Sequence, residues 1–383
     1  MKKAMELALN GWGTTNPNPL VGAVIVKDGW VIGEGFHERR GEDHAEVAAI
    51  KNSTEDIKGA TLYVNLEPCS HFGKTPPCIN AIIESGISNV IIAMQDPNPL
   101  VAGKGIQKLQ EAGIDTVVGV LEDEAKKLNE IFIKYITEKK PFVILKMAMS
   151  LDGKICTSTG QSKWISGEES RRYVHHLRNR VAAVMVGTNT VIKDNPSLTT
   201  RLDDKSRNAT RIILDRKGWI PLNSNVFNTD QLKGNVITAV SQHVDDKLIK
   251  KLEQTGIKVI VVPEVNERLS LNYLMNKLYE QEIDSILLEG GGELNFSALN
   301  EGIVDKVIMF IAPIIIGGSK SLTSVEGEGF NSIKESLKIK NISTKNIGSD
   351  ILIEGYTRQL YKQDKGDGCV HGNCGRNGCC KKC

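Results

Sequence analysis

Three side chains of the kinds that bind zinc constrain this chain most, because a shared metal ion would bring distant segments to one point. His44 and Cys78 each lie at the start of an expected helix, and Cys69 directly follows an expected strand. Thiolate and imidazole are preferred zinc ligands, and a catalytic zinc has three protein ligands and one open position. We therefore predict a zinc site made by His44, Cys69 and Cys78.

Glu46 lies two residues beyond His44, so it need not bind the metal ion. We assign it as the general acid and base, which takes a proton from the attacking water and passes it to the ring nitrogen and the leaving ammonia. The His-x-Glu and Pro-Cys pattern is typical of zinc deaminases, which usually have two residues between the cysteines. Here the cysteines enclose residues 70–77. The alternatives are a structural zinc knuckle or three unrelated buried residues.

Apolar runs alternate with helical spacing in two blocks, which predicts two α/β domains. The first block, 1–140, begins with a hairpin and favours a three-layer α/β/α domain. Its expected strands are 21–26, 31–32, 61–66, 89–94 and 116–120, and its expected helices are 44–52, 79–84, 105–112 and 122–135. A polar break at 138–141 precedes the second α/β domain, 141–362. The expected strands of that domain are 143–149, 184–187, 211–214, 236–240, 259–262, 285–289, 307–311 and 351–355.

The charge and hydropathy of the chain exclude several classes of protein. The net charge is +2, so we expect neither a nucleic-acid partner nor a membrane partner. Hydrophobic residues make up 40% and charged residues 25%, as in soluble globular proteins. The N-terminus lacks the apolar core of a signal peptide, and the longest apolar run, 307–316, is too short to span a bilayer. We expect a cytoplasmic location.

Several longer motifs of this sequence resemble those of one protein family. Cys-Ser-His-Phe-Gly-Lys-Thr-Pro-Pro-Cys at 69–78, Asn-Pro-Asn-Pro-Leu-Val-Gly-Ala-Val at 16–24 and Asp-Pro-Asn-Pro at 96–99 resemble the bifunctional deaminase–reductase family of riboflavin biosynthesis. The resemblance covers about residues 1–360 and includes Lys-Met-Ala-Met-Ser-Leu-Asp-Gly-Lys at 146–154 and Ser-Lys-Trp-Ile-Ser at 162–166. It implies a cytidine-deaminase-like domain followed by a domain similar in fold to dihydrofolate reductase.

The resemblance also implies two reactions and a homo-oligomer. The first is zinc-dependent hydrolytic deamination of 2,5-diamino-6-(5-phosphoribosylamino)pyrimidin-4(3H)-one. The second is NADPH-dependent reduction of the ribosyl side chain of 5-amino-6-(5-phosphoribosylamino)uracil to ribityl. The alternatives are a monofunctional deaminase whose second domain has lost its activity, and a nucleotide-binding or RNA-modifying module. The near-neutral charge speaks against the latter.

The resemblance implies further site residues. The expected substrate contacts of the deaminase are Asn18, His71 and Lys74, which could equally be ordinary turn or loop residues. The expected NADPH contacts are Ala148, Trp164, Thr190, Asp194, Gly291, Gly292 and Glu293, and the expected reductase substrate contacts are Ser162, Arg178, Leu198, Arg201 and Glu289.

Alternatives remain open for several of these residues. Arg178 and Arg201 suit phosphate clamps, because guanidinium binds phosphate oxygens in pairs, but each could form a surface salt bridge. The glycine run at 290–292 suits phosphate binding at a helix start, or a tight turn. Trp164 could belong to the core. Asp152 could stabilise the cationic imine-like form of an opened ribose, but we favour it as a turn-former before Gly153.

The last segment, 363–383, contains five of the eight cysteines and has almost no apolar residues. We expect a Cys-rich, flexible tail, because such a segment cannot bury a core. Its cysteines could form a small zinc or iron–sulfur appendage with His371, or a redox-sensitive disulfide tail. The third alternative is a disordered basic terminus.

Overall fold

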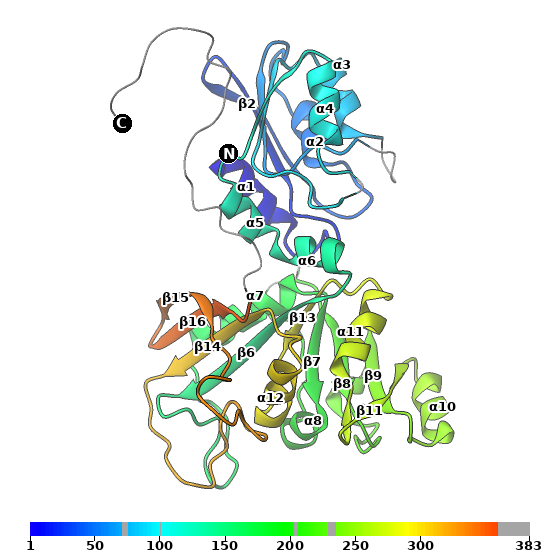
Figure 1. Cartoon of the computed structure of the whole chain (residues 1–383), viewed down its shortest axis with the longest axis vertical. Helices are drawn as coiled ribbons and strands as arrows, with labels where there is room; N and C mark the ends of the chain where they lie inside the picture. Colours follow the sequence, from blue (N-terminus) through cyan, green and yellow to red (C-terminus); the bar gives the residue numbers. More distant parts are fainter. Residues whose placement is uncertain (71–75, 100, 203–205, 229–234, 359–383) are drawn as a thin grey trace.

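The computed structural model describes residues 1–70, 76–99, 101–202, 206–228 and 235–358. They form two α/β domains, each built on its own main sheet (Figure 1). Both fold-class predictions are therefore confirmed. The predicted boundary between residues 140 and 141 remains a prediction, and the tail 363–383 lies outside the described residues. Within the described part of the chain, no helix is long and apolar enough to cross a membrane.

The N-terminal domain has a five-stranded sheet in the order β2-β1-β3-β4-β5. The strands β1 and β2 form the expected hairpin, and β3, β4 and β5 run parallel to one another. The helices α2, α3 and α4 cover one face, and α1 covers the other (Figure 1). The strands are β1 (Gly22–Lys27), β2 (Trp30–Phe36), β3 (Thr61–Val64), β4 (Asn89–Ile92) and β5 (Asp115–Val118). The helices are α1 (Lys2–Ala8), α2 (Ala45–Lys51), α3 (Cys78–Glu84) and α4 (Lys104–Glu111).

The single helix expected over 122–135 is wrong, because two helices occupy this segment. They are α5 (Glu122–Leu128) and α6 (Glu130–Glu138), and they meet at Asn129. The Asn129 amide pairs with the backbone of Leu20: its Oδ1 accepts from the Leu20 N–H at 2.8 Å, and its Nδ2 donates to the Leu20 carbonyl at 3.0 Å. Asn129 thereby fixes the loop before β1 at the point where the helix breaks.

The C-terminal domain has a nine-stranded sheet in the order β10-β9-β8-β7-β13-β6-β14-β16-β15. The seven strands from β10 to β14 are parallel, and β16 and β15 extend the sheet antiparallel. The strands are β6 (Phe142–Ser150), β7 (Ala183–Gly187), β8 (Thr210–Leu214), β9 (Val236–Ser241), β10 (Lys258–Val262), β13 (Ser285–Leu288), β14 (Lys306–Ala312), β15 (Lys340–Ile347) and β16 (Asp350–Tyr356). The helices are α7 (Glu168–Arg180), α8 (Thr188–Asp194), α10 (Asp246–Gln254), α11 (Leu271–Tyr279) and α12 (Gly292–Asn300).

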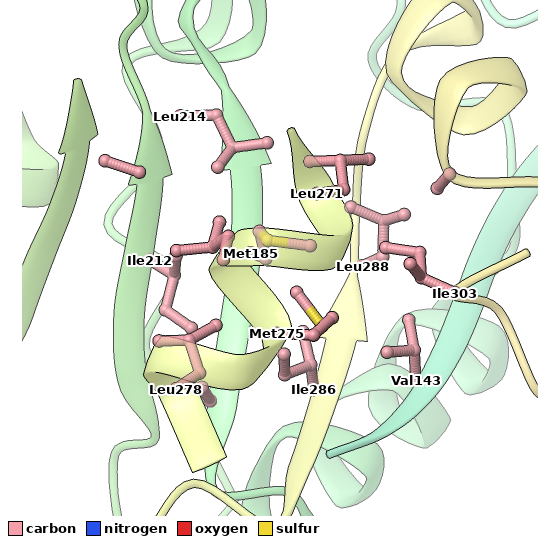
Figure 2. Close-up of a cluster of buried hydrophobic side chains, with 14 of the residues drawn as sticks. Val143, Met185, Ile212, Leu214, Leu271, Met275, Leu278, Ile286, Leu288 and Ile303 are labelled. Carbon is pink, nitrogen blue, oxygen red and sulfur yellow. The ribbon is translucent and has the colours of Figure 1, made fainter. Parts of the chain in front are cut away.

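The core of this domain positions the helices that follow β7 and β13. Met275 and Leu278 of α11 pack against Met185 of β7 and Ile286 of β13 (Figure 2). The strands β7 and β13 are neighbours, and α8 and α12 begin directly after them. Two helix starts therefore lie side by side at the carboxyl edge of the sheet, where open α/β sheets bind dinucleotides.

The helix α2 lies directly on β2 because Gly35 has no side chain. A Cβ atom at Gly35 would lie 2.3 Å from the Ala49 nitrogen and 2.5 Å from the Ala45 oxygen, both in the backbone of α2. Real Cβ atoms do not approach backbone so closely. The spacing between this helix and the sheet therefore depends on glycine at position 35.

Replacing Gly35 by alanine should destabilise the N-terminal domain, because the new methyl group would push α2 off the sheet. Overpacking of this kind lowers the free energy of unfolding by about 1–3 kcal/mol. Urea denaturation followed by circular dichroism measures the change. Gly167→Ala is the matched control, because the nearest atoms to its Cβ are 3.5 Å away. Equal denaturation midpoints for the two variants would contradict this description of the packing.

Candidate functional site

His44, Cys69 and Cys78 meet at one end of α2 and α3. His44 immediately precedes α2, Cys78 is the first residue of α3, and Cys69 lies in the loop after β3. The His44 Nδ1 atom is 3.1 Å from the Cys78 Sγ and 3.4 Å from the Cys69 Sγ, and the two sulfurs are 3.4 Å apart. A triangle of this size fits three corners of a tetrahedral zinc site with bonds of about 2.0–2.3 Å. The N-terminal domain therefore has a zinc site at His44, Cys69 and Cys78.

The surroundings of Cys69 favour its thiolate, which is the form that binds zinc. Hydrogen bonds from the Cys78 thiol and from His44 lower the pKa of Cys69 to about 4, against the effect of burial. The backbone N–H of Cys78 also donates to the Cys69 Sγ at 3.2 Å. The same contact with Cys69 raises the pKa of His44. Of these two shifts only that of Cys69 favours metal binding, because zinc binds the neutral imidazole of histidine.

Glu46 lies in the first turn of α2, one residue beyond the start of the helix. Its side chain is buried, with only 3% of its surface exposed. Burial, and then the nearby charge of Cys69, raise the pKa of Glu46 to about 7. The structure therefore places a buried carboxyl group beside the zinc ligands on the helix that His44 begins.

Asn18 faces His37, a residue that the sequence analysis missed. The Asn18 Nδ2 is 3.1 Å from the His37 Nε2, and the His37 Nδ1 is 3.1 Å from the carbonyl oxygen of Asp43. The carbonyl can only accept, so Nδ1 carries the proton and Nε2 accepts from Asn18. The His37 ring also meets the His44 ring edge to face at 5.2 Å. His37 directly follows β2, at the strand end nearest the ligands, which is the signal that could have identified it. The predicted contacts His71 and Lys74 lie outside the described residues.

Glu67, two residues before Cys69, was also missed. Its buried carboxylate accepts hydrogen bonds from the backbone N–H groups of Asp96, Gly103, Gly105 and Ile106, at 2.8–3.3 Å. One carboxylate therefore holds Asp96 and the 103–106 segment against the loop that carries Cys69. A sequence motif alone does not indicate this role, because the four partners are backbone groups.

In the C-terminal domain, Glu289 follows β13 and is held by two cations. The Arg178 Nε and Nη2 donate to its two oxygens at 2.7 and 3.0 Å, and the Lys146 Nζ is 3.1 Å away. Burial alone would raise the pKa of Glu289, but Arg178 and Lys146 hold it well below its usual range. Lys146, on β6, was not among the predicted site residues. Arg178 therefore forms an ion pair with a buried carboxylate and not a salt bridge at the surface.

The other predicted substrate residues lie in loops of the same domain. Arg201 donates from its backbone N–H to the His175 Nδ1 at 3.2 Å. Burial, with the charges of Arg178 and Arg201, lowers the pKa of His175 to about 4. Leu198 is buried with a φ of 54°, a left-handed conformation that is rare for a branched residue and is typical of functional sites. Ser162 lies half-buried in the segment between β6 and α7.

The predicted cofactor residues lie along the carboxyl edge of the sheet. Thr190 and Asp194 are in α8, Gly291–Glu293 form the start of α12, and Ala148 is in β6. Trp164 is 67% exposed and lies under the Arg171 guanidinium at 4.8 Å, so the alternative that it belongs to the core is wrong. Asp152 accepts hydrogen bonds from Ser150 and from the backbone of 316 and 317, which fits its interpretation as a turn-former.

A pocket of about 200 Å³ opens beside the first turns of α8 and α12. Leu214, Leu269 and Leu294 give it an apolar lining, and Arg216 and Arg268 add two cations. The Arg216 Nη1 is 3.0 Å from a Glu264 oxygen, and the Arg268 Nη1 donates to the Ser297 hydroxyl at 3.0 Å. The pocket therefore combines an apolar surface with two arginines, each of which also pairs with a carboxylate, Glu264 or Glu293.

Two family models match the chain, one for each domain. Residues 1–94 match the cytidine and deoxycytidylate deaminase zinc-binding region, and residues 141–353 match the RibD C-terminal domain. The first match includes all three zinc ligands, and the second includes Lys146, Arg178 and Glu289.

Relatives cover both domains together. The riboflavin biosynthesis protein RibD of Aquifex aeolicus is 47% identical, over 92% of this chain and 96% of its own length. A solved structure from Thermotoga maritima, described as a diaminohydroxyphosphoribosylaminopyrimidine deaminase and 5-amino-6-(5-phosphoribosylamino)uracil reductase, is 42% identical with a TM-score of 0.82, covering 93% of this chain and 97% of that one. Acinetobacter baumannii RibD is 36% identical with a TM-score of 0.83, covering 94% of this chain and 98% of that one. This chain therefore belongs to the RibD family of bifunctional deaminase–reductases of riboflavin biosynthesis.

Proposed function

We propose that the N-terminal site deaminates 2,5-diamino-6-(5-phosphoribosylamino)pyrimidin-4(3H)-one and that the C-terminal site then reduces the ribosyl group of the resulting uracil with NADPH. The observation that carries the proposal is the buried carboxyl of Glu46 beside the triangle of His44, Cys69 and Cys78. The Thermotoga maritima relative carries these two activities in its description.

In the deamination, Glu46 moves the proton. Zinc, when bound, would lower the pKa of a water molecule, which makes this water a nucleophile for the ring carbon that carries the amine. Glu46 accepts one proton of that water and gives it to the ring nitrogen, and it then takes the second proton from the hydroxyl of the substrate adduct and gives it to the departing ammonia. The His37 ring, protonated at Nδ1, orients the Asn18 amide, and this amide donates to the pyrimidine ring. His71 and Lys74 bind the ribose phosphate.

In the reduction, the chain positions two partners and supplies a proton. Bound NADPH supplies a hydride to the sugar carbon attached to the ring amine. Ala148, Trp164, Thr190, Asp194 and the segment Gly291–Glu293 bind the cofactor, and Ser162, Arg178, Leu198, Arg201 and Glu289 bind the substrate. We propose Lys146 as the donor of the proton that the sugar ring oxygen takes up when the ring opens, because its ammonium lies at Glu289, one of the predicted substrate contacts.

The pocket beside α8 and α12 supports a preference for NADPH over NADH. Backbone N–H groups at the two helix starts suit the pyrophosphate. A dinucleotide bound there would extend its adenosine into the apolar pocket, toward Arg216 and Arg268. Only NADPH carries a 2′-phosphate to pair with these arginines.

We further propose that the chain forms a homo-oligomer in the cytoplasm. The edge strand β15 exposes nearly all of its side chains, including Ile342 at 61%, and the segment before it exposes Ile333 at 91%. An open sheet edge with apolar side chains suits pairing with a second copy. The unpaired thiols Cys69, Cys78 and Cys156 fit a reducing compartment. Sedimentation as a single chain would contradict the oligomer.

Glu46→Gln should reduce ammonia release about 10²–10⁴-fold, because an amide cannot carry the proton. Zinc content, measured by elemental analysis, should stay at one ion per chain, whereas Cys69→Ala should lose the ion. NADPH oxidation with preformed deaminated substrate should be unchanged in Glu46→Gln, since that site is in the other domain. Ammonia release by Glu46→Gln at the wild-type rate would refute the role of Glu46.

Replacing Arg216 and Arg268 by glutamine should weaken binding of adenosine 2′,5′-bisphosphate about 10- to 100-fold, because charge-assisted hydrogen bonds are lost. Binding of AMP should change little, since AMP lacks the 2′-phosphate. Calorimetry on the purified chain measures both affinities. Lys217→Gln is the control for the loss of a positive charge, because the Lys217 ammonium lies over the Trp219 ring. An equal loss for both nucleotides would contradict 2′-phosphate recognition.

A further inference from the structure

We infer that the reductase domain completes the substrate wall of the deaminase site. The inference rests on the proposed deamination and adds residues outside the deaminase domain to it. The segment 282–284, directly before β13, contacts both loops that form the Asn18–His37 pair. These contacts make Glu282 and Asp284 positioning residues for a reaction in the neighbouring domain.

The first contact joins Asn16 to Asp284. The Asn16 Nδ2 donates to the Asp284 Oδ2 at 2.6 Å, and the Asp284 carboxylate is 1% exposed. The Asn16 Oδ1 accepts from the Arg207 Nη2 at 3.3 Å, so both ends of this amide are bound by the reductase domain. Asn16 is two residues from Asn18, and a shift of its side chain therefore moves the pyrimidine contact.

Close packing at Gly13 fixes the start of the same loop. Gly13 has a φ of 88°, and a Cβ atom there would lie 2.2 Å from the backbone oxygen of Asn179 in α7. The loop backbone thus lies directly against the reductase domain.

The second contact holds the loop between β2 and α2. The two terminal nitrogens of Arg40 donate to the two Glu282 oxygens at 2.8 and 2.7 Å. This loop begins with His37 and ends at Asp43, whose carbonyl sets the His37 tautomer. The hydroxyl of Thr14 donates to the carbonyl of Glu38, which joins the two loops. The Asn18–His37 pair is therefore anchored from both sides.

The two contacts differ in strength. Arg40 and Glu282 are 37% and 58% exposed, so solvent screens their ion pair and makes it the weaker anchor. The Asn16–Asp284 bond is charge-assisted and buried, which makes it the stronger anchor. A cavity of about 30 Å³, lined by Asn16, Asn18 and Asp284, lies beside it and has room for about two water molecules. Beside Asn16 the packing leaves room for movement, so hydrogen bonds fix this part of the loop, whereas close packing fixes its start at Gly13.

The test compares two activities of the full-length, zinc-loaded chain. Asn16→Ala and Asp284→Asn should raise the KM for the diaminopyrimidine about tenfold, because misplacing a binding group by a fraction of an ångström is costly. NADPH oxidation with preformed deaminated substrate and zinc content should stay at wild-type values. Arg40→Glu should raise the same KM about threefold by like-charge repulsion with Glu282, and adding Glu282→Arg should restore it.

Controls separate positioning from stability. Glu280→Gln removes a nearby carboxylate that pairs with Lys277 in its own domain, and should leave both activities unchanged. Should Asp284→Asn fail to fold, Asn16→Ala and the charge-reversal pair still decide the question. The inference is overturned if Asn16→Ala leaves the deamination KM unchanged, if both activities fall together, or if Glu282→Arg does not rescue Arg40→Glu. A wild-type chain that releases no ammonia would overturn the proposed deamination and this inference with it.

Discussion

The convergence of His44, Cys69 and Cys78 is the constraint on which the N-terminal domain depends. His44 and Cys78 lie at the starts of α2 and α3, and Cys69 lies in the loop after β3, so their meeting point fixes the two helices and this loop relative to one another. Gly35 lets α2 approach the sheet. The Glu67 carboxylate accepts hydrogen bonds from the backbone of the 103–106 segment, which holds that segment near the Cys69 loop. Glu46 lies on the same helix, so the element that orients a ligand also orients the proton carrier.

Two buried ion pairs join α6 to the second domain. The Lys134 ammonium of α6 pairs with Asp305 at 2.5 Å, and Lys306 pairs with Glu130 at 3.2 Å, with all four side chains at most 7% exposed. Such pairs tolerate little displacement, because separating them leaves a buried charge without a partner. Ile131 of α6 also packs into the core of the reductase domain. Buried ion pairs and core packing therefore hold the orientation of the two domains, and this orientation brings Asp284 to Asn16.

The sequence predicts what depends on local pattern and motif. Alternating apolar runs predicted both α/β domains, and residue types at strand and helix ends predicted the zinc ligands. The helix break at Asn129 escaped prediction because it depends on a pairing with Leu20, more than one hundred residues away. The strand β15 escaped because its side chains are exposed and carry no apolar alternation. Glu67 and Lys146 escaped because their partners are brought to them only by the fold, whereas the place of His37 directly after β2 was a signal that the sequence analysis did not use. The roles of the predicted substrate and cofactor residues remain predictions.

In the proposed function, one chain deaminates first and reduces second. The most direct measurement is turnover of 2,5-diamino-6-(5-phosphoribosylamino)pyrimidin-4(3H)-one by the purified chain, with and without NADPH, following ammonia, NADPH and both pyrimidine products. Without NADPH, ammonia should be released and the ribosyl uracil should accumulate. With NADPH, ammonia release and NADPH oxidation should reach equal amounts, and the ribityl product should form. Oxidation of NADPH without ammonia release, or a ribityl product that still carries the ring amine, would contradict the order of the two steps.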